Sequence, residues 1–317
     1  MKQLLALDFG GTFVKHALID NEGNLSERGE IPAPLSSVSD FVQVIKDLYE
    51  KNRDKADGIA VSMPGVIDSD TGYLFSAGAY TQTMGKQNLF DLLKDIDVPV
   101  AVENDGKAAV LAEAWKGSLQ GVKDAAAVII GSGLGGGIIM DGKLRKGAHF
   151  ASGEISGLLV EPGKYEFTNF AATRAAMSAL LSAVAVAKGM SPAQFEVSGF
   201  MTDEKPDPNL PIYSGKDVFS WIDEGDPVTV GVYQEWIKAL VMVIYNLKMT
   251  LDPEKIVIGG GVSRNPRLIK DIQAEYDKSG PLMAAFGMPP VIIETCQFTA
   301  DANLLGAVYN WILHHEN

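Results

Sequence analysis

Residues 4–18 read Leu-Leu-Ala-Leu-Asp-Phe-Gly-Gly-Thr-Phe-Val-Lys-His-Ala-Leu, and the same design returns at residues 127–140, Ala-Val-Ile-Ile-Gly-Ser-Gly-Leu-Gly-Gly-Gly-Ile-Ile-Met. Each copy is an apolar strand, a glycine turn and a second apolar strand, followed by a turn signal. Glycine at the tip of a hairpin lets backbone N–H groups approach a phosphate that any Cβ would hold off. Two such hairpins, one in each half of the chain, predict a duplicated nucleotide-binding fold.

Composition excludes several classes of protein. The 317 residues are enough for two domains with a substantial core. The net charge of −13 argues against a nucleic-acid partner, because such binding depends on Lys and Arg neutralising phosphates. It does not exclude ATP, which N–H groups, a few cations and Mg²⁺ can hold. A single cysteine, Cys296, excludes an intrachain disulfide and a cysteine-based metal cluster.

The sequence also bears on location. Acidic and glycine residues interrupt the opening apolar stretch by Asp8, so we read no signal peptide there. No apolar run approaches the roughly 20 residues that a membrane span needs. We therefore expect a cytoplasmic protein with no membrane partner.

Strand and helix patterns alternate along the chain, which is typical of an α/β architecture. In the first half we expect strands at 2–8, 13–20, 57–62 and 98–102, and helices at 38–52, 90–95 and 107–115. In the second half, after the second hairpin, we expect helices at 170–188, 227–250 and 302–315, strands at 255–258 and 291–294, and a loop at 202–212. The predicted domains are 1–116 plus 297–317, and 117–296.

The first glycine turn carries a candidate phosphate and Mg²⁺ site. Asp8 ends a strand and would act on the metal through water, while Gly10, Gly11 and Thr12 would approach the phosphates; we add Lys15 to this set. An ordinary β-turn is the alternative, since Asp and Gly are common in turns.

The second glycine turn, with Gly131, Ser132, Gly133 and Gly135, formally matches the G-x-G-x-x-G pattern. A dinucleotide-binding site of that type needs a helix directly after the glycines. Here a strand and a turn follow, so we reject that interpretation and expect a hairpin phosphate loop. A third run, Gly259, Gly260 and Gly261, ends a buried strand and would let adenine or ribose approach; a tight turn before a helix is the alternative.

Glu103-Asn104-Asp105 comes at the carboxyl end of a strand, where open α/β sheets bind ligands. Asn104 and Asp105 could hydrogen-bond neighbouring sugar hydroxyls, and Asp105 could take a proton from one of them. Helix capping is the alternative, since Asn and Asp are preferred caps. Glu154 is a further candidate hydroxyl acceptor, or a solvated loop carboxylate. The four histidines have no metal-ligand spacing, and neither a Walker A sequence nor a nucleophile elbow occurs.

Together these motifs resemble the ROK family of sugar kinases, in the actin/hexokinase/Hsp70 superfamily. The anchors, which span nearly the whole chain, are Leu7–Thr12, Met63-Pro64-Gly65, Glu103–Asp105, Gly131–Gly137, Gly153-Glu154 and Ile258–Gly261. The resemblance implies duplicated ribonuclease H-like (actin-like ATPase) domains, with ATP phosphates between the hairpins and a sugar in an interdomain cleft. It implies Asp105 as general base, Asn104, Glu154 and Gly65 as sugar-binding residues, and a homodimer.

One departure from the family pattern concerns zinc. Typical members have a sugar-contacting histidine three residues after the Glu of the Gly-Glu motif, and then a cysteine-rich zinc loop. Here Gly157 replaces the histidine, and no cysteine follows through Asn169, so we expect no zinc. Residues 164–173 stand where the family supplies another sugar ligand. The zinc-less pattern resembles the β-glucoside kinase branch.

We therefore expect an ATP- and Mg²⁺-dependent kinase that phosphorylates a hexose or a β-glucoside, at the C6 hydroxyl, with Asp105 as base. Three alternatives are a sugar-sensing regulator of the same family, a sugar-binding protein without activity, and an ATPase that acts on no sugar. Regulators of the family carry an N-terminal helix-turn-helix, whereas here the first strand is expected to begin near Lys2. The sequence does not determine which sugar is used.

Overall fold

The computed structural model describes residues 2–197 and 201–316, and its contacts divide the chain into two compact units. Unit 1 comprises Met1–Val122, Gly137–Gly153 and Gln297–Asn317, and unit 2 comprises Lys123–Gly136 and Glu154–Cys296. These ranges differ from the predicted domains in placing residues 117–122 and 137–153 in the first unit. The chain forms two mixed five-stranded sheets, with helices between their strands, so the α/β class expected from the sequence is observed.

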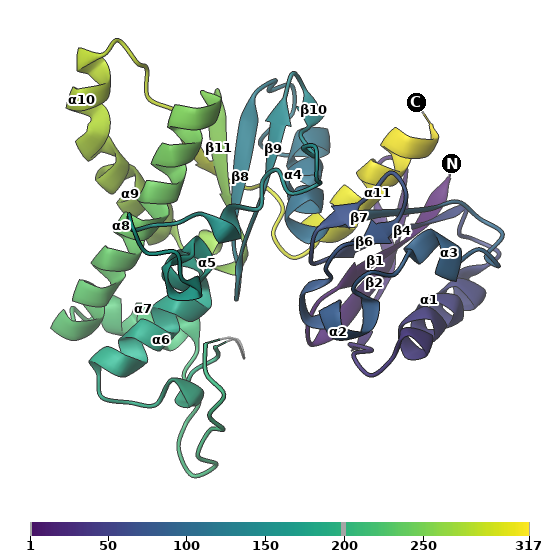
Figure 1. The fold of residues 1–317 in the computed structure, drawn as a ribbon, viewed down its shortest axis with the longest axis horizontal. Coiled ribbons are helices and arrows are strands. Elements are labelled where there is room, and N and C mark those ends of the chain that lie inside the picture. The colour runs from purple at the N-terminus through teal and green to yellow at the C-terminus, as the bar shows by residue number, and fades with distance from the viewer. Residues whose placement is uncertain (1, 198–200, 317) are drawn as a thin grey trace. The chain divides into compact units, whose positions relative to one another are not determined.

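The sheet of unit 1 has the strand order β3-β2-β1-β4-β7 (Figure 1). Its strands are β1 Gln3–Phe9, β2 Phe13–Asp20, β3 Leu25–Pro32, β4 Gly58–Met63 and β7 Val100–Asn104. Neighbours pair antiparallel from β3 to β1 and parallel from β1 to β7. The parallel part is buried on both faces, which is why β1 and β4 read as continuous apolar runs.

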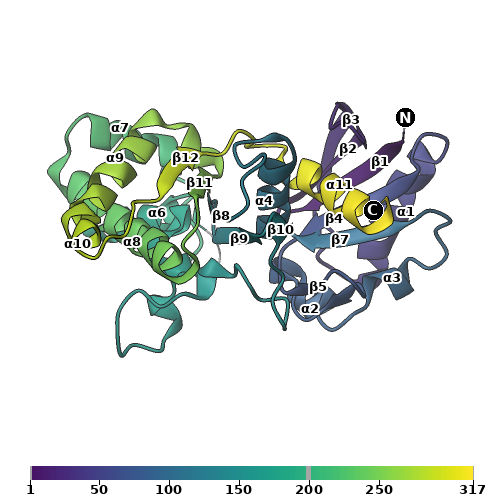
Figure 2. The same ribbon diagram turned by 90° about the horizontal axis from the view of Figure 1, so that it is seen from above.

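Helices cover the two faces of this sheet. On one face lies α1, Val38–Asn52, whose Phe41, Ile45 and Leu48 recur at helical spacing and pack against the strands. The other face is covered by α4, Asp105–Lys116, and α11, Ala302–His315, which share one apolar cluster with β1 and β4 (Figure 2). Shorter elements are β5 Ile67–Asp68, β6 Tyr73–Leu74, η1 Gly78–Tyr80, α2 Thr81–Met84 and α3 Leu89–Leu92. The helix predicted at 90–95 is thus the four-residue α3, capped by Asn88.

The second sheet has the order β10-β9-β8-β11-β12. Strands β8, β11 and β12 belong to unit 2, β9 runs on from unit 2 into unit 1, and β10 belongs to unit 1. Its strands are β8 Ala125–Ile130, β9 Leu134–Met140, β10 Lys143–Leu144, β11 Lys255–Gly259 and β12 Ile292–Thr295. The helices are α5 Ala171–Ala175, α6 Met177–Ala187, α7 Gly215–Asp223, α8 Pro227–Leu251, α9 Pro266–Tyr276 and α10 Gly280–Ala285, and the single-turn helices are η2 Ile155–Gly157, η3 Phe167–Asn169, η4 Pro192–Gln194, η5 Gly261–Arg264 and η6 Asp277–Ser279.

The helix predicted at 170–188 is wrong in one respect, because it is broken at Ala176 into α5 and α6. Ala176 is extended (φ −74°, ψ 165°), and its carbonyl accepts a hydrogen bond from the indole of Trp236 at 2.9 Å. The break also exposes the first N–H groups of α6. Met177 N donates to the carbonyl of Gly131 at 3.0 Å, so α6 starts where it can bond the glycine turn.

Helix α8 is the core helix of unit 2. Its 25 residues are long and apolar enough to cross a membrane, by length and composition alone. The sequence analysis expected no segment of this kind. Its buried side chains, among them Trp236, Leu240 and Val243, belong to the main apolar cluster of the unit. The packing of α8 is therefore that of a helix in a protein core.

Candidate functional site

The predicted site residues fall into two groups, one in each unit. Unit 1 holds Asp8, Gly10, Gly11, Thr12, Lys15, Gly65, Asn104 and Asp105, and unit 2 holds Gly131, Ser132, Gly133, Gly135, Glu154, Gly259, Gly260 and Gly261.

Asp8 lies at the end of β1 and is 8% exposed. Its Oδ1 accepts hydrogen bonds from Ser62 Oγ at 3.2 Å and from Asn303 Nδ2 at 3.1 Å. Burial raises the pKa of Asp8, and the charge of Asp105 raises it further, whereas Asn303 and Lys15 lower it. A buried carboxyl held in a fixed orientation beside a second carboxyl is a favourable place for a cation.

The turn after Asp8 is fixed at Gly10. Gly10 N donates to the carbonyl of Phe13 at 3.0 Å, and the hydroxyl of Tyr80 donates to the carbonyl of Gly10 at 2.6 Å. Gly11 and Thr12 are exposed beyond this anchor. A Cβ added at Gly11 would make only an ordinary contact of 3.6 Å with Ala79, so packing does not require glycine there.

Asn104 and Asp105 join β7 to α4. Asn104 Oδ1 accepts from Lys107 N at 3.0 Å, so the capping interpretation is correct for Asn104. Its Nδ2 donates to the carbonyl of Gly65 at 2.9 Å and to Asp105 Oδ1 at 3.1 Å. Asp105 is the first residue inside the helix and is not its N-cap. Capping therefore explains one member of the pair and leaves the carboxyl of Asp105 for another role.

The environment of Asp105 favours a proton acceptor. Burial raises the pKa of Asp105 above its ordinary value, while the N–H of Gly106, at 2.8 Å from Oδ1, and the charge of Lys107 lower it. Since the charge of Asp105 also acts on Asp8, the two carboxyls belong to one electrostatic site. A carboxylate with a raised pKa is a stronger base near neutral pH than an exposed Asp.

Gly65 positions Asn104 through its carbonyl. It has a positive φ of 116°, and a Cβ there would lie 2.2 Å from the carbonyl oxygen of Ser76. The turn Met63-Pro64-Gly65 therefore requires glycine for the fold itself. Its predicted contact with the sugar stays a prediction.

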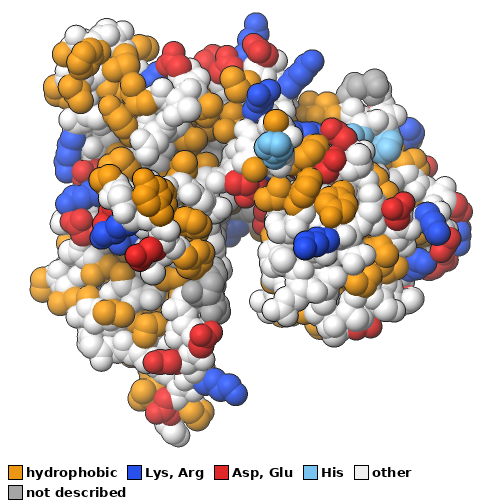
Figure 3. Space-filling model, in the orientation of Figure 1, with side chains coloured by type: hydrophobic (Ala, Val, Ile, Leu, Met, Phe, Trp, Pro, Cys, Tyr) orange, Lys and Arg blue, Asp and Glu red, His pale blue; other side chains and the backbone are white. Residues whose placement is uncertain are grey.

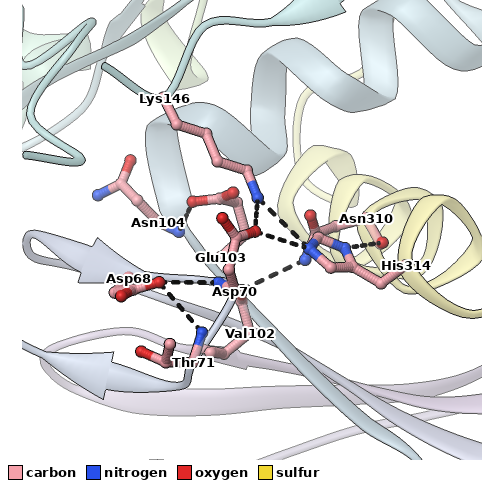
Figure 4. Close-up of polar contacts among 9 residues, drawn as sticks. All are labelled: Asp68, Asp70, Thr71, Val102, Glu103, Asn104, Lys146, Asn310 and His314. Atoms are coloured by element: carbon pink, nitrogen blue, oxygen red, sulfur yellow. Dashed lines mark hydrogen bonds and ion pairs between the residues drawn. The ribbon is translucent and has the colours of Figure 1, made fainter. Parts of the chain in front are cut away.

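Glu103 lies directly behind this pair and is 1% exposed. Its Oε1 accepts from Asn104 N at 2.8 Å, and burial raises the pKa of Glu103. Within residues 2–197 and 201–316, the buried side-chain polar atoms without a hydrogen-bond partner are Glu103 Oε2 and Ser69 Oγ. The charge of Lys146 lowers the pKa of Glu103, and Lys146 Nζ donates to Asp70 Oδ1 at 2.6 Å (Figure 4).

In unit 2, Gly131, Ser132 and Gly133 form the turn between β8 and β9. Gly131 N donates to the carbonyl of Gly133 at 3.0 Å, and the carbonyls of Gly131 and Ser132 accept from the first turn of α6. Gly133 has no positive φ, and a Cβ there would meet no atom within 4 Å. Neither conformation nor packing thus requires glycine at 133, and its predicted contact with phosphate stays a prediction.

The rest of this glycine run extends into β9, where Gly135 lies partly buried. Packing explains the next two glycines. A Cβ on Gly136 would lie 2.7 Å from the carbonyl oxygen of Ala127, and one on Gly137 would lie 2.4 Å from Val110 Cγ1. The number of glycines in the run is thus not by itself evidence of a phosphate site.

The third glycine run follows β11, which pairs parallel with β8. Gly260 has a φ of 90°, and a Cβ there would lie 2.1 Å from the carbonyl oxygen of Ile130, so the tight-turn interpretation is correct for it. Gly259 packs against Ile129 and Cys296. A Cβ added at Gly261 would meet no atom within 4 Å, and Gly261 lines a cavity. It is therefore the member of the run best suited to contact a ligand.

That cavity has a volume of about 1060 Å³ and lies within unit 2. Met177, Phe219 and Val262 supply apolar walls, and Lys216 and Arg264 supply positive charge. Because the N–H of Met177 bonds the carbonyl of Gly131, the cavity adjoins the glycine turn. The sequence analysis did not identify Lys216. The pattern that could have located it is the capping box of Ser214 and Asp217, which marks the start of α7.

Glu154 directly precedes η2 and is partly buried. The segment after it is closed by the side chain of Asn169, which is 2% exposed. Asn169 Nδ2 donates to the carbonyls of Glu161 and Lys164, both at 2.7 Å, and its Oδ1 accepts from Glu161 N at 2.9 Å. Across the described part of the chain, no group of three or more His, Cys, Asp or Glu is placed to hold a metal ion.

The chain is similar to known proteins along nearly its whole length. The model described as "ROK family" matches residues 4–314. A β-glucoside kinase of Listeria innocua is 31% identical over 324 residues, covering 99% of both chains. The solved Lmo2764 protein of Listeria monocytogenes has a TM-score of 0.83 and 29% identity, covering 99% of this chain and 100% of that one. A Streptomyces griseus glucokinase, solved with glucose and AMPPNP, has a TM-score of 0.78 and 23% identity, covering 96% and 98%.

Proposed function

The chain belongs to the ROK family and is a sugar kinase, and we propose that it transfers the γ-phosphoryl group of ATP to the C6 hydroxyl of a hexose or a β-glucoside. The similar Listeria protein is named a β-glucoside kinase, which supports a glucoside substrate. The two sheets pair their strands in the same order, which supports a duplicated actin-like core.

The proposed binding of ATP rests on one observation, which is that a glycine turn lies beside a large cavity within unit 2. Gly133 needs to be glycine for neither conformation nor packing, so its N–H can lie against a phosphate. The adjoining cavity has apolar walls for a flat base, and Lys216 and Arg264 supply positive charge at its rim. We assign phosphate contacts to Gly131, Ser132 and Gly133, and the nucleoside to the cavity beside Gly261.

In the proposed reaction the Asp105 carboxylate accepts the proton of the sugar hydroxyl as that oxygen attacks the γ-phosphorus. The bond between the γ-phosphorus and the bridging oxygen breaks, and ADP leaves with its electron pair. Asn104 has an amide that is already oriented by Gly65 and Lys107, so it can hold a neighbouring hydroxyl without reorganising. Glu154 would accept a further sugar hydroxyl.

The residues present fit a magnesium ion that arrives with ATP. Mg²⁺ in kinases is bound by one or two carboxylates together with phosphate oxygens and water. Asp8 would supply such a carboxylate, and a positive charge beside it would offset the burial that raises its pKa. The ion would neutralise charge on the transferring phosphoryl group. Gly10, Gly11, Thr12 and Lys15 are the proposed neighbours of those phosphates.

The test is a coupled ADP-release assay over a panel of hexoses, amino sugars, and phenolic and disaccharide β-glucosides. We expect sugar-dependent ADP release, with a β-glucoside among the best substrates, and ³¹P–¹³C NMR of the product should place the phosphate on C6. Release that does not depend on any sugar would indicate an ATPase. Sugar binding without ADP release would indicate a regulator or an inactive binding protein.

A homodimer and a cytoplasmic location are also proposals. Figure 3 shows hydrophobic side chains gathered over α10, where Leu282 is 56% exposed and the following Phe286 is 71% exposed. Large exposed apolar side chains are typical of association surfaces. Light scattering on the purified protein would give its mass, and a monomer at micromolar concentration would contradict the dimer.

A further inference from the structure

Three aromatic side chains of unit 1 form a cluster, and one of them is largely uncovered. The ring of Phe75 contacts Tyr73 edge to face, with a centroid distance of 5.0 Å. It also lies nearly parallel to the ring of Phe150, with a centroid distance of 6.4 Å and an angle of 26°. Despite these two contacts, Phe75 is 49% exposed. A single exposed apolar residue is ordinary, whereas aromatic rings held together beside a polar site are suited to bind a ligand.

The backbone of Phe75 is bonded to the turn that positions Asn104. Phe75 N donates to the carbonyl of Val66 at 2.9 Å. The residue before Val66 is Gly65, whose carbonyl accepts from Asn104 Nδ2 at 2.9 Å. Phe75 therefore lies beside the turn that holds Asn104, and so beside the residues that we propose bind the sugar.

Phe150 is linked to the same residue by a different route. Its carbonyl accepts from Lys107 Nζ at 2.8 Å, and Lys107 N donates to Asn104 Oδ1 at 3.0 Å. Lys107 is 1% exposed, and burying an ammonium costs free energy unless the group is paired. The fold thus places a buried ammonium against the Phe150 carbonyl. Two chains of hydrogen bonds, one from each phenylalanine, meet at Asn104.

The backbone of Phe150 is strained. It has a positive φ of 56°, in the left-handed region that bulky residues rarely adopt. Strain of this kind persists only where the surrounding structure enforces it, and it is concentrated at ligand sites. Glycine would adopt the same conformation without strain. The strain is therefore a cost of having an aromatic ring at this position, next to Phe75.

We propose that Phe75 and Phe150 bind a ring-shaped substituent on C1 of a β-glucoside, while Asn104 and Asp105 hold its glucose unit. The inference rests on the proposed β-glucoside substrate and names the side chains that would recognise the substituent. An aromatic face stacks, offset, on a phenyl ring, and it packs in the same way against the C–H bonds on one face of a second sugar. Both substituents present a ring with an apolar face, which a methyl group or a free hydroxyl lacks.

The experiment measures kcat/KM of wild type and Phe75→Ala for phenyl β-glucoside, cellobiose, methyl β-glucoside and glucose. Loss of an aromatic contact should lower kcat/KM for the first two compounds by roughly 2- to 10-fold. The loss should fall mainly on KM, because the contact is the same before and during phosphoryl transfer. Values for methyl β-glucoside and glucose should stay near those of wild type. A loss for phenyl β-glucoside alone, or for cellobiose alone, would identify which ring the site accepts.

Further variants separate the aromatic face from bulk and from folding. Phe75→Tyr keeps the ring and should keep the wild-type preference, whereas Phe75→Leu keeps an apolar side chain without a ring and should lose most of it. Phe150→Gly removes the second ring and suits the positive φ, so it should fold and lose the same preference. Leu313→Ala removes an exposed apolar side chain from α11 of the same unit and is the control, with no expected change. Melting curves check that each variant is folded.

The outcomes distinguish this inference from the proposed function. Equal losses for every compound in Phe75→Ala would indicate a structural role and overturn the inference. Phosphorylation of β-glucosides with no effect of Phe75→Ala would refute only the aromatic contact. Phosphorylation of glucose but of no β-glucoside would refute the glucoside substrate and the inference with it.

A wild type that phosphorylates no sugar would refute the proposed reaction. Calorimetric titration with phenyl β-glucoside in the absence of nucleotide then decides on the aromatic contact by itself. Weaker binding to Phe75→Ala than to wild type would support the contact, and equal binding, or none to wild type, would overturn it.

Discussion

Individual glycines of the site differ in what the fold demands of them. At Gly65 and Gly260 a Cβ would lie 2.2 and 2.1 Å from a backbone oxygen, so substitution there would disturb folding before function. At Gly133 and Gly261 a Cβ would meet no atom within 4 Å. Substitutions at the second pair therefore report on ligand binding with little effect on the fold.

Gly133→Val tests the phosphate turn. A branched side chain would stand where the backbone must approach phosphate, so we expect a clear loss of ATP affinity, with an unchanged melting temperature and intact sugar binding without nucleotide. Gly231→Val, at an exposed position of α8 with equally open surroundings, is the matched control. If Gly133→Val keeps its apparent affinity for ATP, the turn has only a structural role.

Asp105→Asn tests the base. General base catalysis is worth about 10²–10⁴-fold, so turnover should fall by roughly that factor. Sugar affinity should change far less, because an amide still hydrogen-bonds a hydroxyl. Since Asn104 is the cap of α4, the helix should keep its stability. Melting temperature and sugar-dependent ADP release, measured side by side, check this; wild-type turnover would move the site to Glu154 or Asp8.

Local pattern was enough to propose some of these residues and insufficient for others. Asp8 and Asn104 stand at strand ends, where adjacent residues already indicate a ligand site. The buried Lys107 is held by a partner far away in sequence, the carbonyl of Phe150, which no local pattern indicates. Arg264 carried no local signal, because it becomes part of the site only when the cavity of unit 2 forms.

At the level of elements, amphipathic spacing predicted the bounds of some helices well. It did not predict the edge strand β3 or the break between α5 and α6. The bounds expected for α1 and α11 are the observed ones, because both have a clear apolar face. The edge strand β3 was missed because most of its side chains are exposed and carry no apolar alternation. The break at Ala176 was missed because its causes, Trp236 and the glycine turn, are distant in sequence.

Glu113 links two helices of unit 1 and provides a test of element packing. Its carboxylate accepts from the N–H groups of Ser118 at 2.7 Å, Gln297 at 3.0 Å and Phe298 at 2.7 Å, and so ties the end of α4 to the segment that leads into α11. Glu113→Ala would leave these donors unpaired. A buried unpaired group costs about 1–3 kcal/mol, so we expect a loss of at least that size in the free energy of unfolding.

Denaturant titration checks this prediction. Glu113→Gln keeps an acceptor oxygen and should lose less stability than Glu113→Ala. Glu235→Ala removes an exposed carboxylate from α8 and serves as the control, with little expected change. Equal stability of Glu113→Ala and wild type would show that water replaces the lost acceptor.

For the whole molecule, the alternation of strands and helices was enough to predict the α/β class. The unit bounds were harder to predict, because β9 is a single continuous strand that belongs partly to each unit. Continuous hydrophobicity along one strand gives no signal of such a change.

Metal dependence is a property of the whole enzyme. We expect EDTA to abolish activity by removing Mg²⁺, and added Mg²⁺ alone to restore it fully. The segment after Glu154 is held by the amide of Asn169 and by pairs of Glu161 with Lys164 and Arg174, and these bonds need no metal. Elemental analysis provides the check, since one tightly bound zinc per chain would contradict the prediction.

The division of the chain has a consequence for its biosynthesis. Unit 1 contains the first residues of the chain, yet α11 near the C-terminus supplies Leu304, Val308 and Trp311 to its core. On the ribosome, the faces of β1 and β4 that α11 covers therefore stay uncovered until α11 has been synthesised. Unit 2, complete at Cys296, is the first to have all its residues synthesised, which reverses the usual N-terminal-first order of co-translational folding. The nascent first unit is thus the natural client for chaperones.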